Sequence, residues 1–326
     1  MSKSNLPVTG GQNNLNPMQA AVSVFDARKA ALKQTQYSAR VTRYNPCAIV
    51  ILIDQSGSME RQFSETTSRA QAVADIVNDL FDNLIMKCQK EGGIRDYFNI
   101  LVIGYGKEIG DSEVSIIWEG NLAGKDWVTV SELKDNILSI ETIETVKMMP
   151  WGQVPDIKTK KIWINPCCDG LTPMHEALQL CKNKLEDWVF DKQDSYPPMV
   201  FNITDGHPTD IDGNMHLLSE VCSQIKSVGT KDGNALLFNC LLTDGEEIVL
   251  PSDTNISEFD DDEYLLALFH ASSTLPHEMK NIAKQCFQDD RFLLGDTKGV
   301  IINSTVSSLI NLLNIGTNTA LGNAGE

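Results

Sequence analysis

The chain has 326 residues, a formal net charge of −17 and a hydrophobic content of 42%. This length suits one large domain or two small ones, and no apolar run approaches the roughly 20 residues of a membrane-spanning helix. The acidity, with no lysine or arginine cluster to offset it, argues against nucleic acid as a partner, because phosphates need basic patches.

The two ends of the chain differ in composition from its centre. The start, MSKSNLPVTGGQNN, is polar and lacks the apolar stretch of a secretory signal, so we expect a cytoplasmic protein without membrane insertion. Residues 1–15 are predicted to be a disordered tail. Residues 16–44 are predicted to form a helix and a lead-in, since Asn16 can cap and Pro17 suits a first turn. Residues 316–326 are predicted to be a flexible tail.

Between residues 45 and 315, short apolar runs alternate with helical patterns. The predicted strands start at Cys47, Phe98, Val114, Pro198, Ala235 and Asp290. The predicted helices are 70–84, Pro173–Trp188, Asn214–Val228, Leu275–Phe287 and Val300–Leu313. This alternation predicts an α/β fold, a doubly wound, mostly parallel, Rossmann-like sheet with helices on both faces. The run VSIIWEG from Val114 follows the previous strand so closely that we expect one antiparallel edge strand. Residues 119–165 fit the rhythm poorly and are interpreted as an elaborated segment of the same domain.

The 8 cysteines are scattered and form no CxxC pair, so neither a zinc ribbon nor a thioredoxin-like motif is supported. Most lie inside apolar patterns, and we expect buried, reduced thiols. The adjacent pair Cys167–Cys168 is the exception to this pattern and could be sensitive to oxidation.

Oxygen-bearing side chains lie next to three of the predicted elements. Asp54, Ser56 and Ser58 come directly after the first strand, and Asp205 follows the run PMVFNIT. Thr172 precedes the helix that starts at Pro173. In an open parallel sheet ligands sit beyond the carboxyl ends of the strands, so these side chains are expected to converge.

Each motif alone has an ordinary structural explanation. Thr172-Pro173 is a typical helix start, and Asp205-Gly206 is a common turn pair. The serines around Gly57 could form a plain turn. Together, however, the two carboxylates and three hydroxyls, without a Cys or His ligand, suit a hard cation, Mg²⁺ or Mn²⁺.

The arrangement resembles the von Willebrand factor A (VWA) domain with an intact metal-ion-dependent adhesion site (MIDAS). That family's pattern is D-x-S-x-S after the first strand, a later Thr, and an Asp after the fourth strand. The chain matches it at Asp54, Ser56, Ser58, Thr172 and Asp205, over residues 45–315. The stretches GLTPMHEAL and FNITDGHPTD resemble bacterial intracellular, TerY-type members linked to tellurium resistance. The segment 119–165 and the N-terminal helix depart from a compact VWA domain.

The resemblance implies that Ser56 and Ser58 bind the metal directly, and Thr172 directly or through water. Asp54 and Asp205 would act mainly through water. The metal would then accept a Glu or Asp carboxylate from a partner protein, with Gln55, Asp169, Gly170 and His207 on the rim. The resemblance also suggests a bacterial stress-response or defence complex, associated with a kinase and a phosphatase.

Two alternatives to a non-enzymatic interaction module stay open. Asp54 could be the nucleophile of a Mg²⁺-dependent phosphoryl-transfer enzyme, although Ser56 stands where a second acid is wanted and no phosphate-holding lysine is evident. The domain could also be a scaffold that no longer uses metal. Neither a P-loop nor a G-x-S-x-G motif is present.

Overall fold

The computed structural model describes residues 36–64, 66–109, 112–149, 151–253 and 262–325. The expected tail 1–15 and most of the expected helix in 16–44 therefore lie outside the described residues. The described chain from Tyr37 onward forms one compact unit. No helix in these ranges has the length and apolarity that crossing a bilayer requires.

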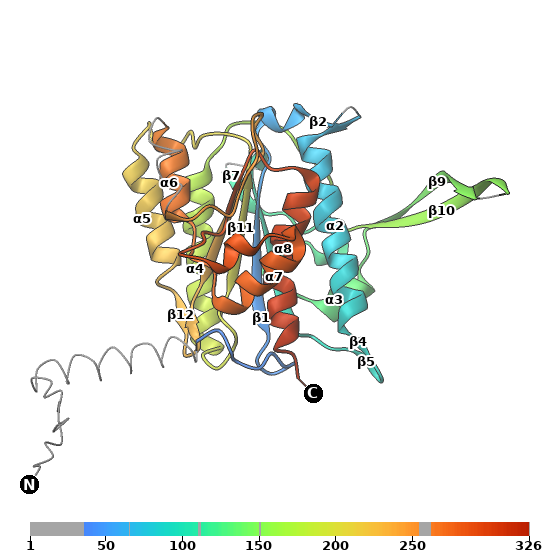
Figure 1. Cartoon of the computed structure of the whole chain (residues 1–326), viewed down its shortest axis with the longest axis horizontal. Helices are drawn as coiled ribbons and strands as arrows, with labels where there is room; N and C mark the ends of the chain where they lie inside the picture. Colours follow the sequence, from blue (N-terminus) through green and yellow to red (C-terminus); the bar gives the residue numbers. More distant parts are fainter. Residues whose placement is uncertain (1–35, 65, 110–111, 150, 254–261, 326) are drawn as a thin grey trace, which may run out of the picture. The chain divides into compact units, whose positions relative to one another are not determined.

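A mostly parallel sheet forms the centre of this unit (Figure 1). Its strands are β1 (Cys47–Asp54), β6 (Phe98–Ile109), β7 (Ser112–Ile116), β8 (Val128–Thr129), β11 (Met199–Thr204), β14 (Leu236–Leu241), β15 (Ile248–Val249) and β16 (Val300–Ile302). The order is β15-β16-β14-β11-β1-β6-β7, and β8 also pairs with β6. The strands from β16 to β6 run parallel, whereas β7, β8 and β15 are antiparallel to their neighbours. The predicted antiparallel edge strand is β7, and β15 is a second one at the opposite edge.

Helices cover both faces of the sheet, as the alternation of patterns predicted (Figure 1). They are α2 (Arg69–Cys88), α3 (Val130–Asp135), α4 (Met174–Asp191), α5 (Met215–Ile225), α6 (Glu263–Ala271), α7 (His277–Phe287) and α8 (Val306–Gly322). One apolar cluster joins the sheet to α2, α3, α7 and α8, and another joins it to α4, α5 and α6. Every residue of β1, β11 and β14 is buried. Burial on both faces explains why these strands are continuous apolar runs in the sequence.

Short elements connect the main ones. They are the hairpins β2 (Gln62–Ser64)–β3 (Thr67–Ser68), β4 (Gln89–Lys90)–β5 (Gly93–Ile94) and β12 (Gly229–Thr230)–β13 (Gly233–Asn234), and the 3₁₀ turns η1 (Gly57–Glu60), η2 (Gly120–Leu122) and η4 (Asp290–Leu293). The elaborated segment 119–165 contains η2, β8, α3 and a long hairpin. We call that hairpin, β9 (Ser139–Met149) and β10 (Gly152–Ile162), the ribbon; it projects from the main sheet and its helices (Figure 1).

Two expectations near the C-terminus were wrong. The predicted strand at Asp290 is the 3₁₀ turn η4, which the Asp289 side chain caps through the amide of Arg291. The last parallel strand is β16, Val300–Ile302, which the sequence had assigned to the final helix. Its three residues are all apolar and β-branched, and they complete the sheet beside β14.

The final helix extends beyond the expected end at Leu313. Residues 316–322 are helical rather than a flexible tail, and Ala320 is buried. At Gly316, a Cβ would lie 2.7 Å from Cζ of Phe201 and 2.9 Å from Sδ of Met199. The glycine therefore lets α8 approach strand β11 closely, and this contact anchors the helix that the polar composition had suggested would be loose.

Candidate functional site

The candidate site lies where the sheet changes its winding direction. From β1 the chain continues to β6 on one side, and later to β11 on the other side of β1. Asp54 is the last residue of β1, and Asp205 directly follows β11. The site is therefore at the carboxyl ends of the strands and at a topological switch point, where open α/β sheets bind ligands.

Backbone hydrogen bonds bring two of the predicted loops together. The amide of Asp169 donates to the carbonyl of Gln55 at 2.6 Å, and the amide of Gly57 donates to the carbonyl of Gly170 at 3.1 Å. These bonds fix the segment before Thr172 against the loop that follows β1.

The same segment is held to the third loop. Thr172 donates its amide to Oγ1 of Thr209 at 3.0 Å, and its carbonyl accepts from the amide of Thr209 at 2.9 Å. The three loops that the sequence singled out thus form one contiguous surface at this edge of the sheet.

Four of the five predicted metal ligands form one hydrogen-bonded cluster. The buried Asp54 accepts from the amide of Ser56 at 2.9 Å. Oγ of Ser56 lies 3.0 Å from Oγ of Ser58. Oγ of Ser58 in turn donates to Oδ1 of Asp205 at 2.5 Å. The fifth predicted ligand, Thr172, is buried in the adjoining loop.

The two carboxylates of this cluster have different electrostatic surroundings. Burial raises the pKa of Asp54; hydrogen bonds from Ser56 and Thr204 oppose this, and the charge of Asp205 adds to it. In the part of the chain that the structure describes, no lysine, arginine or histidine forms an ion pair with Asp54. Asp205, in contrast, pairs with Nη1 of Arg69 at 2.9 Å.

The donor set fits a hard divalent cation. All side chains in the cluster present oxygen, and one buried carboxylate lacks a cationic partner among the described residues. No group of three or more His, Cys, Asp or Glu side chains among these residues could hold a metal. A site here would consequently depend on its hydroxyl groups.

The helix-start explanation of Thr172 can be tested against the structure. Helix α4 begins after Pro173, whose apolar ring cannot accept a capping hydrogen bond. Instead, the carboxylate of Asp210 accepts from the amides of His175 and Glu176, at 3.3 and 2.8 Å. The cap of α4 therefore comes from the Asp205 loop, which further ties the second and third loops together.

The four residues expected on the rim differ in how exposed they are. Asp169, Gly170 and His207 are exposed. Gln55 is only 5% exposed, and its carboxamide packs against Gly104 of β6. The side chain of Gln55 therefore lies beneath the loop, whereas the rim residue expected from the sequence would be exposed.

His207 is held by a residue that sequence reasoning missed. Its ring packs against that of Tyr264 of α6 at a tilt of 31°, with centroids 4.2 Å apart, and the Tyr264 hydroxyl donates to the carbonyl of Gly206 at 2.7 Å. Helix α6 thereby supports the loop that carries Asp205 and His207.

Arg69 and Thr204 were also missed. Thr204 donates its hydroxyl to Oδ2 of Asp54 at 2.7 Å. A signal for Arg69 was present, since it stands four residues before Val73 on the buried face of α2. Thr204 is simply the last residue of a buried strand, and nothing in its sequence context marks it.

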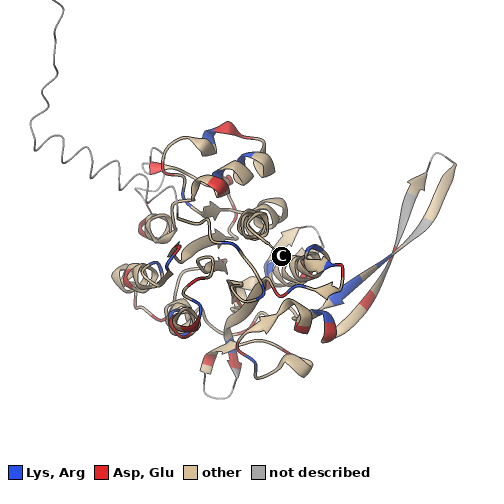
Figure 2. Cartoon of the chain, turned by 90° about the horizontal axis from the view of Figure 1, so that it is seen from below, with Lys and Arg blue, Asp and Glu red and all other residues tan. Residues whose placement is uncertain are grey.

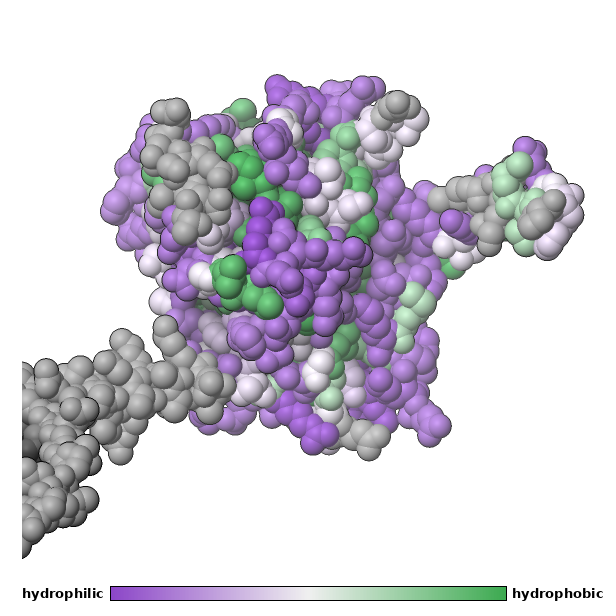
Figure 3. Space-filling view, in the orientation of Figure 1, coloured by the Kyte–Doolittle hydropathy of each residue, from purple (hydrophilic) through white to green (hydrophobic). Residues whose placement is uncertain are grey.

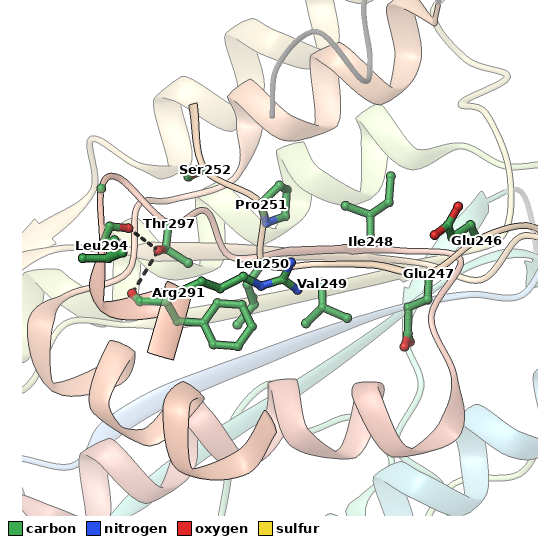
Figure 4. A pocket seen from close by; sticks show the side chains of 12 residues that line it. Glu246, Glu247, Ile248, Val249, Leu250, Pro251, Ser252, Arg291, Leu294 and Thr297 are labelled. Carbon is green, nitrogen blue, oxygen red and sulfur yellow. Dashed lines mark hydrogen bonds between the residues drawn. The ribbon is translucent and has the colours of Figure 1, made fainter. Parts of the chain in front are cut away.

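A surface pocket of about 940 Å³ lies away from the candidate site (Figure 4). It is bordered by β15 and η4, and Thr297 closes one end by donating to the carbonyls of Phe292 and Leu294. None of the predicted site residues lines it.

Comparisons with known proteins give only distant structural likenesses. No model of a protein family matches the chain, and no curated protein matches it. A manganese-loaded TRAP protein of Plasmodium vivax shares 16% identity, with 63% of this chain and 60% of that chain covered and a TM-score of 0.31. The pilus adhesin SpaC of Lactobacillus rhamnosus GG shares 14% identity, with 87% and 31% covered and a TM-score of 0.46. A von Willebrand factor type A structure from Catenulispora acidiphila shares 11% identity, with 74% and 50% covered and a TM-score of 0.34.

Each of these three matches covers 60% or less of the other chain. The TM-scores are all below 0.5, so neither a site nor an activity passes from these proteins to this chain. The α/β fold rests on the strand order and helix layers described above.

Proposed function

We propose that this chain is a VWA-type, non-enzymatic protein-interaction module that uses a divalent cation to bind an acidic residue of a partner protein. The single observation that carries the proposal is the oxygen cluster at the switch point. There, Asp54, Ser56, Ser58 and Asp205 are linked in sequence by hydrogen bonds, and Asp54 has no ion-pair partner among the described residues.

Neutral and charged side chains would contribute to ion binding in different ways. The hydroxyls of Ser56 and Ser58 would hold Mg²⁺ or Mn²⁺ directly, and Thr172 would do so directly or through water. Asp54 and Asp205 would stabilise the ion mainly through water and through the serines. A cation held by neutral hydroxyls keeps its charge available, and it supplies the position that a Glu or Asp carboxylate of the partner fills.

The placement of Asp54 favours this function over phosphoryl transfer. One of its oxygens accepts from the amide of Ser56 and the other from the hydroxyl of Thr204. A nucleophile must reach its substrate, whereas this carboxylate is fully buried beneath the loop. A bacterial stress-response or defence complex with a kinase and a phosphatase is part of the proposal through the TerY-type resemblance alone.

Calorimetric titration of Mg²⁺ and Mn²⁺ tests the proposal. Wild-type protein should bind one ion, and Ser58→Ala and Thr172→Ala should weaken binding by about 10–100-fold, because each removes an oxygen ligand. Ser64→Ala, which removes an exposed hydroxyl from the nearby strand β2, is the matched control and should bind like wild type.

Circular dichroism should show that all the variants stay folded. Unchanged metal affinity in both Ser58→Ala and Thr172→Ala would contradict the proposal. If metal binds but the partner is retained after EDTA treatment, the domain is a metal-independent scaffold instead.

A further inference from the structure

Arg69 is a buried cation next to the candidate metal site. It is the first residue of α2 and is 2% exposed. Its Nη1 donates to Oδ2 of Asp205 at 2.9 Å, and its Nη2 lies 3.3 Å from Oδ2 of Asp244, whose side chain is 93% exposed. Its Nε is buried without a hydrogen-bond partner among the described residues. Burying a guanidinium is costly, so its position depends on the Asp205 pair.

The pair changes the charge that a metal would meet. Asp205 uses one oxygen for Ser58 and the other for Arg69. Asp54, Asp205 and Arg69 then sum to a net charge of −1 (−1 −1 +1). A divalent cation at this cluster is attracted by two carboxylates and repelled by one guanidinium, at distances where such interactions are large in a buried setting.

We propose that Arg69 makes cation binding depend on the partner's carboxylate. The inference rests on the function proposed above and concerns the regulation of the same site. With Asp205 neutralised by Arg69, the cluster holds a divalent ion weakly. An incoming carboxylate supplies the missing negative charge, so the ion and the acidic partner bind cooperatively. The guanidinium is thus a specificity-determining group, because it penalises a metal without an acidic ligand.

Asp244 acts in the opposite direction from Arg69. It contacts the same guanidinium from the exposed side and offsets part of its charge. Removing the Asp244 carboxylate leaves Arg69 more strongly positive and so lowers the affinity for a cation. Changes at Arg69 and Asp244 should therefore shift metal affinity in opposite directions, which a purely structural role of the ion pair does not predict.

The test is calorimetric titration of Mn²⁺ in sodium chloride and in sodium acetate of equal ionic strength. Acetate serves as the carboxylate probe. Wild type should bind Mn²⁺ more tightly in acetate. Arg69→Gln should bind Mn²⁺ about tenfold more tightly than wild type in chloride, and acetate should add less. Arg69→Lys keeps the charge and should restore the dependence on acetate.

Arg61→Gln is the matched control. Arg61 is exposed, and its backbone contacts both Ser58 and Arg69, so the variant removes the same charge close by but outside the buried cluster. It should bind Mn²⁺ like wild type in both salts. If folded Arg69→Gln binds Mn²⁺ with wild-type or lower affinity in chloride, the inference is overturned.

Asp244→Asn tests the same inference without disturbing a buried group. We expect a loss of Mn²⁺ affinity of about threefold or more in chloride, with Glu246→Gln as an exposed neighbouring control that changes nothing. Wild-type affinity in Asp244→Asn would overturn the role of Arg69, even if Arg69→Gln failed to fold. Absence of Mn²⁺ binding to wild type in both salts would instead overturn the proposed function, and this inference with it.

Discussion

Gly170 shows how a single residue without a side chain shapes the candidate site. Its φ is +77°, and a Cβ there would lie 1.9 Å from the carbonyl oxygen of Gly106. Gly106 also has a positive φ, +121°, and a Cβ there would lie 2.7 Å from the amide of Ser56. The two glycines therefore let the end of β6, the loop before Thr172 and the loop after β1 meet at backbone distance.

We predict that Gly170→Ala lowers the free energy of unfolding by about 2–4 kcal/mol and weakens metal binding, because the new methyl group forces the loops apart. Gly213→Ala is the matched control. Gly213 has the same φ of +77°, but a Cβ added there would have no atom within 4 Å. Gly213→Ala should therefore lower the free energy of unfolding only by the cost of placing alanine in the left-handed region, about 1 kcal/mol. Urea unfolding checks both, and equal losses would show that the contact with Gly106 is unimportant.

At the scale of elements, the ribbon projects away from the core and exposes apolar side chains (Figure 1). Ile140, Met148 and Ile157 share one of its faces by register, and Trp151 is at its tip. These four side chains are between 59% and 76% exposed, and apolar colour is visible on the outer ribbon (Figure 3). An isolated two-stranded hairpin is marginally stable in water, so the ribbon depends on its base.

The base of the ribbon is held by charges and by one buried amide. Lys160 and Lys161 pair with Asp75 and Asp82 of α2, and blue residues mark this end of the ribbon in Figure 2. Oδ1 of Asn78 accepts from the amide of Trp163 at 2.9 Å, just beyond β10. Among the described side chains of the distal ribbon, none forms such an ion pair or hydrogen bond with α2.

We predict that the distal ribbon can be removed without loss of the fold. Thr142 and Thr159 are cross-strand partners, so an Asn-Gly turn can join them in place of residues 143–158. The free energy of unfolding should stay within about 1 kcal/mol of wild type, and Mn²⁺ affinity should not change.

Asn78→Ala provides the contrast for this prediction. It leaves the amide of Trp163 unpaired and should cost about 1–3 kcal/mol in urea unfolding. A shortened ribbon that destabilises the protein as much as Asn78→Ala would contradict the account.

The elements differ in how far the sequence could predict them. The strands β1, β11 and β14 were predictable, because burial on both faces leaves a continuous apolar run. The ribbon was not, since its turn lacks an Asn-Gly signal and its strands face no core. The run Val300–Ile302 merged with the apolar pattern of α8, which hid the strand.

The loops that form the candidate site could be predicted from the sequence, but the cationic partner of Asp205 could not. The spacing of Asp54, Ser56 and Ser58 and the positions of Thr172 and Asp205 followed from the order of strands and helices. Arg69 could not be placed next to Asp205 from sequence, because the contact joins residues 136 positions apart. The inward orientation of the Gln55 side chain could not be predicted either, because it depends on the path of the loop after β1.

At the scale of the whole molecule, buried thiols should make the free energy of unfolding depend on pH in the alkaline range. All 8 cysteines are free, and Cys47, Cys88, Cys181, Cys222 and Cys240 are buried, as their apolar sequence patterns predicted. Burial raises the pKa of Cys222 and of Cys240 to about 12. The unfolded chain, with thiol pKa values of about 8.5, loses these protons first.

A group that binds its proton more tightly in the folded chain stabilises the fold fully below its unfolded pKa and loses this contribution as pH rises. We predict that the free energy of unfolding falls above about pH 8.5, by up to about 1.4 kcal/mol per pH unit for each of Cys222 and Cys240. Urea unfolding between pH 7 and 10 checks this. Replacing both cysteines by alanine should make the dependence shallower, because the other buried thiols still contribute, whereas Cys168→Ala, at an exposed position, should leave it unchanged. Equal slopes in the double variant and wild type would contradict the assignment.

Anomalous diffraction from crystals of the protein grown or soaked with Mn²⁺ would locate a bound metal ion directly. We predict one strong manganese peak beside the hydroxyl groups of Ser56, Ser58 and Thr172, and its loss in Ser58→Ala crystals. A peak only at other acidic residues, or no peak at saturating Mn²⁺, would contradict a metal-dependent site at the carboxyl ends of β1 and β11.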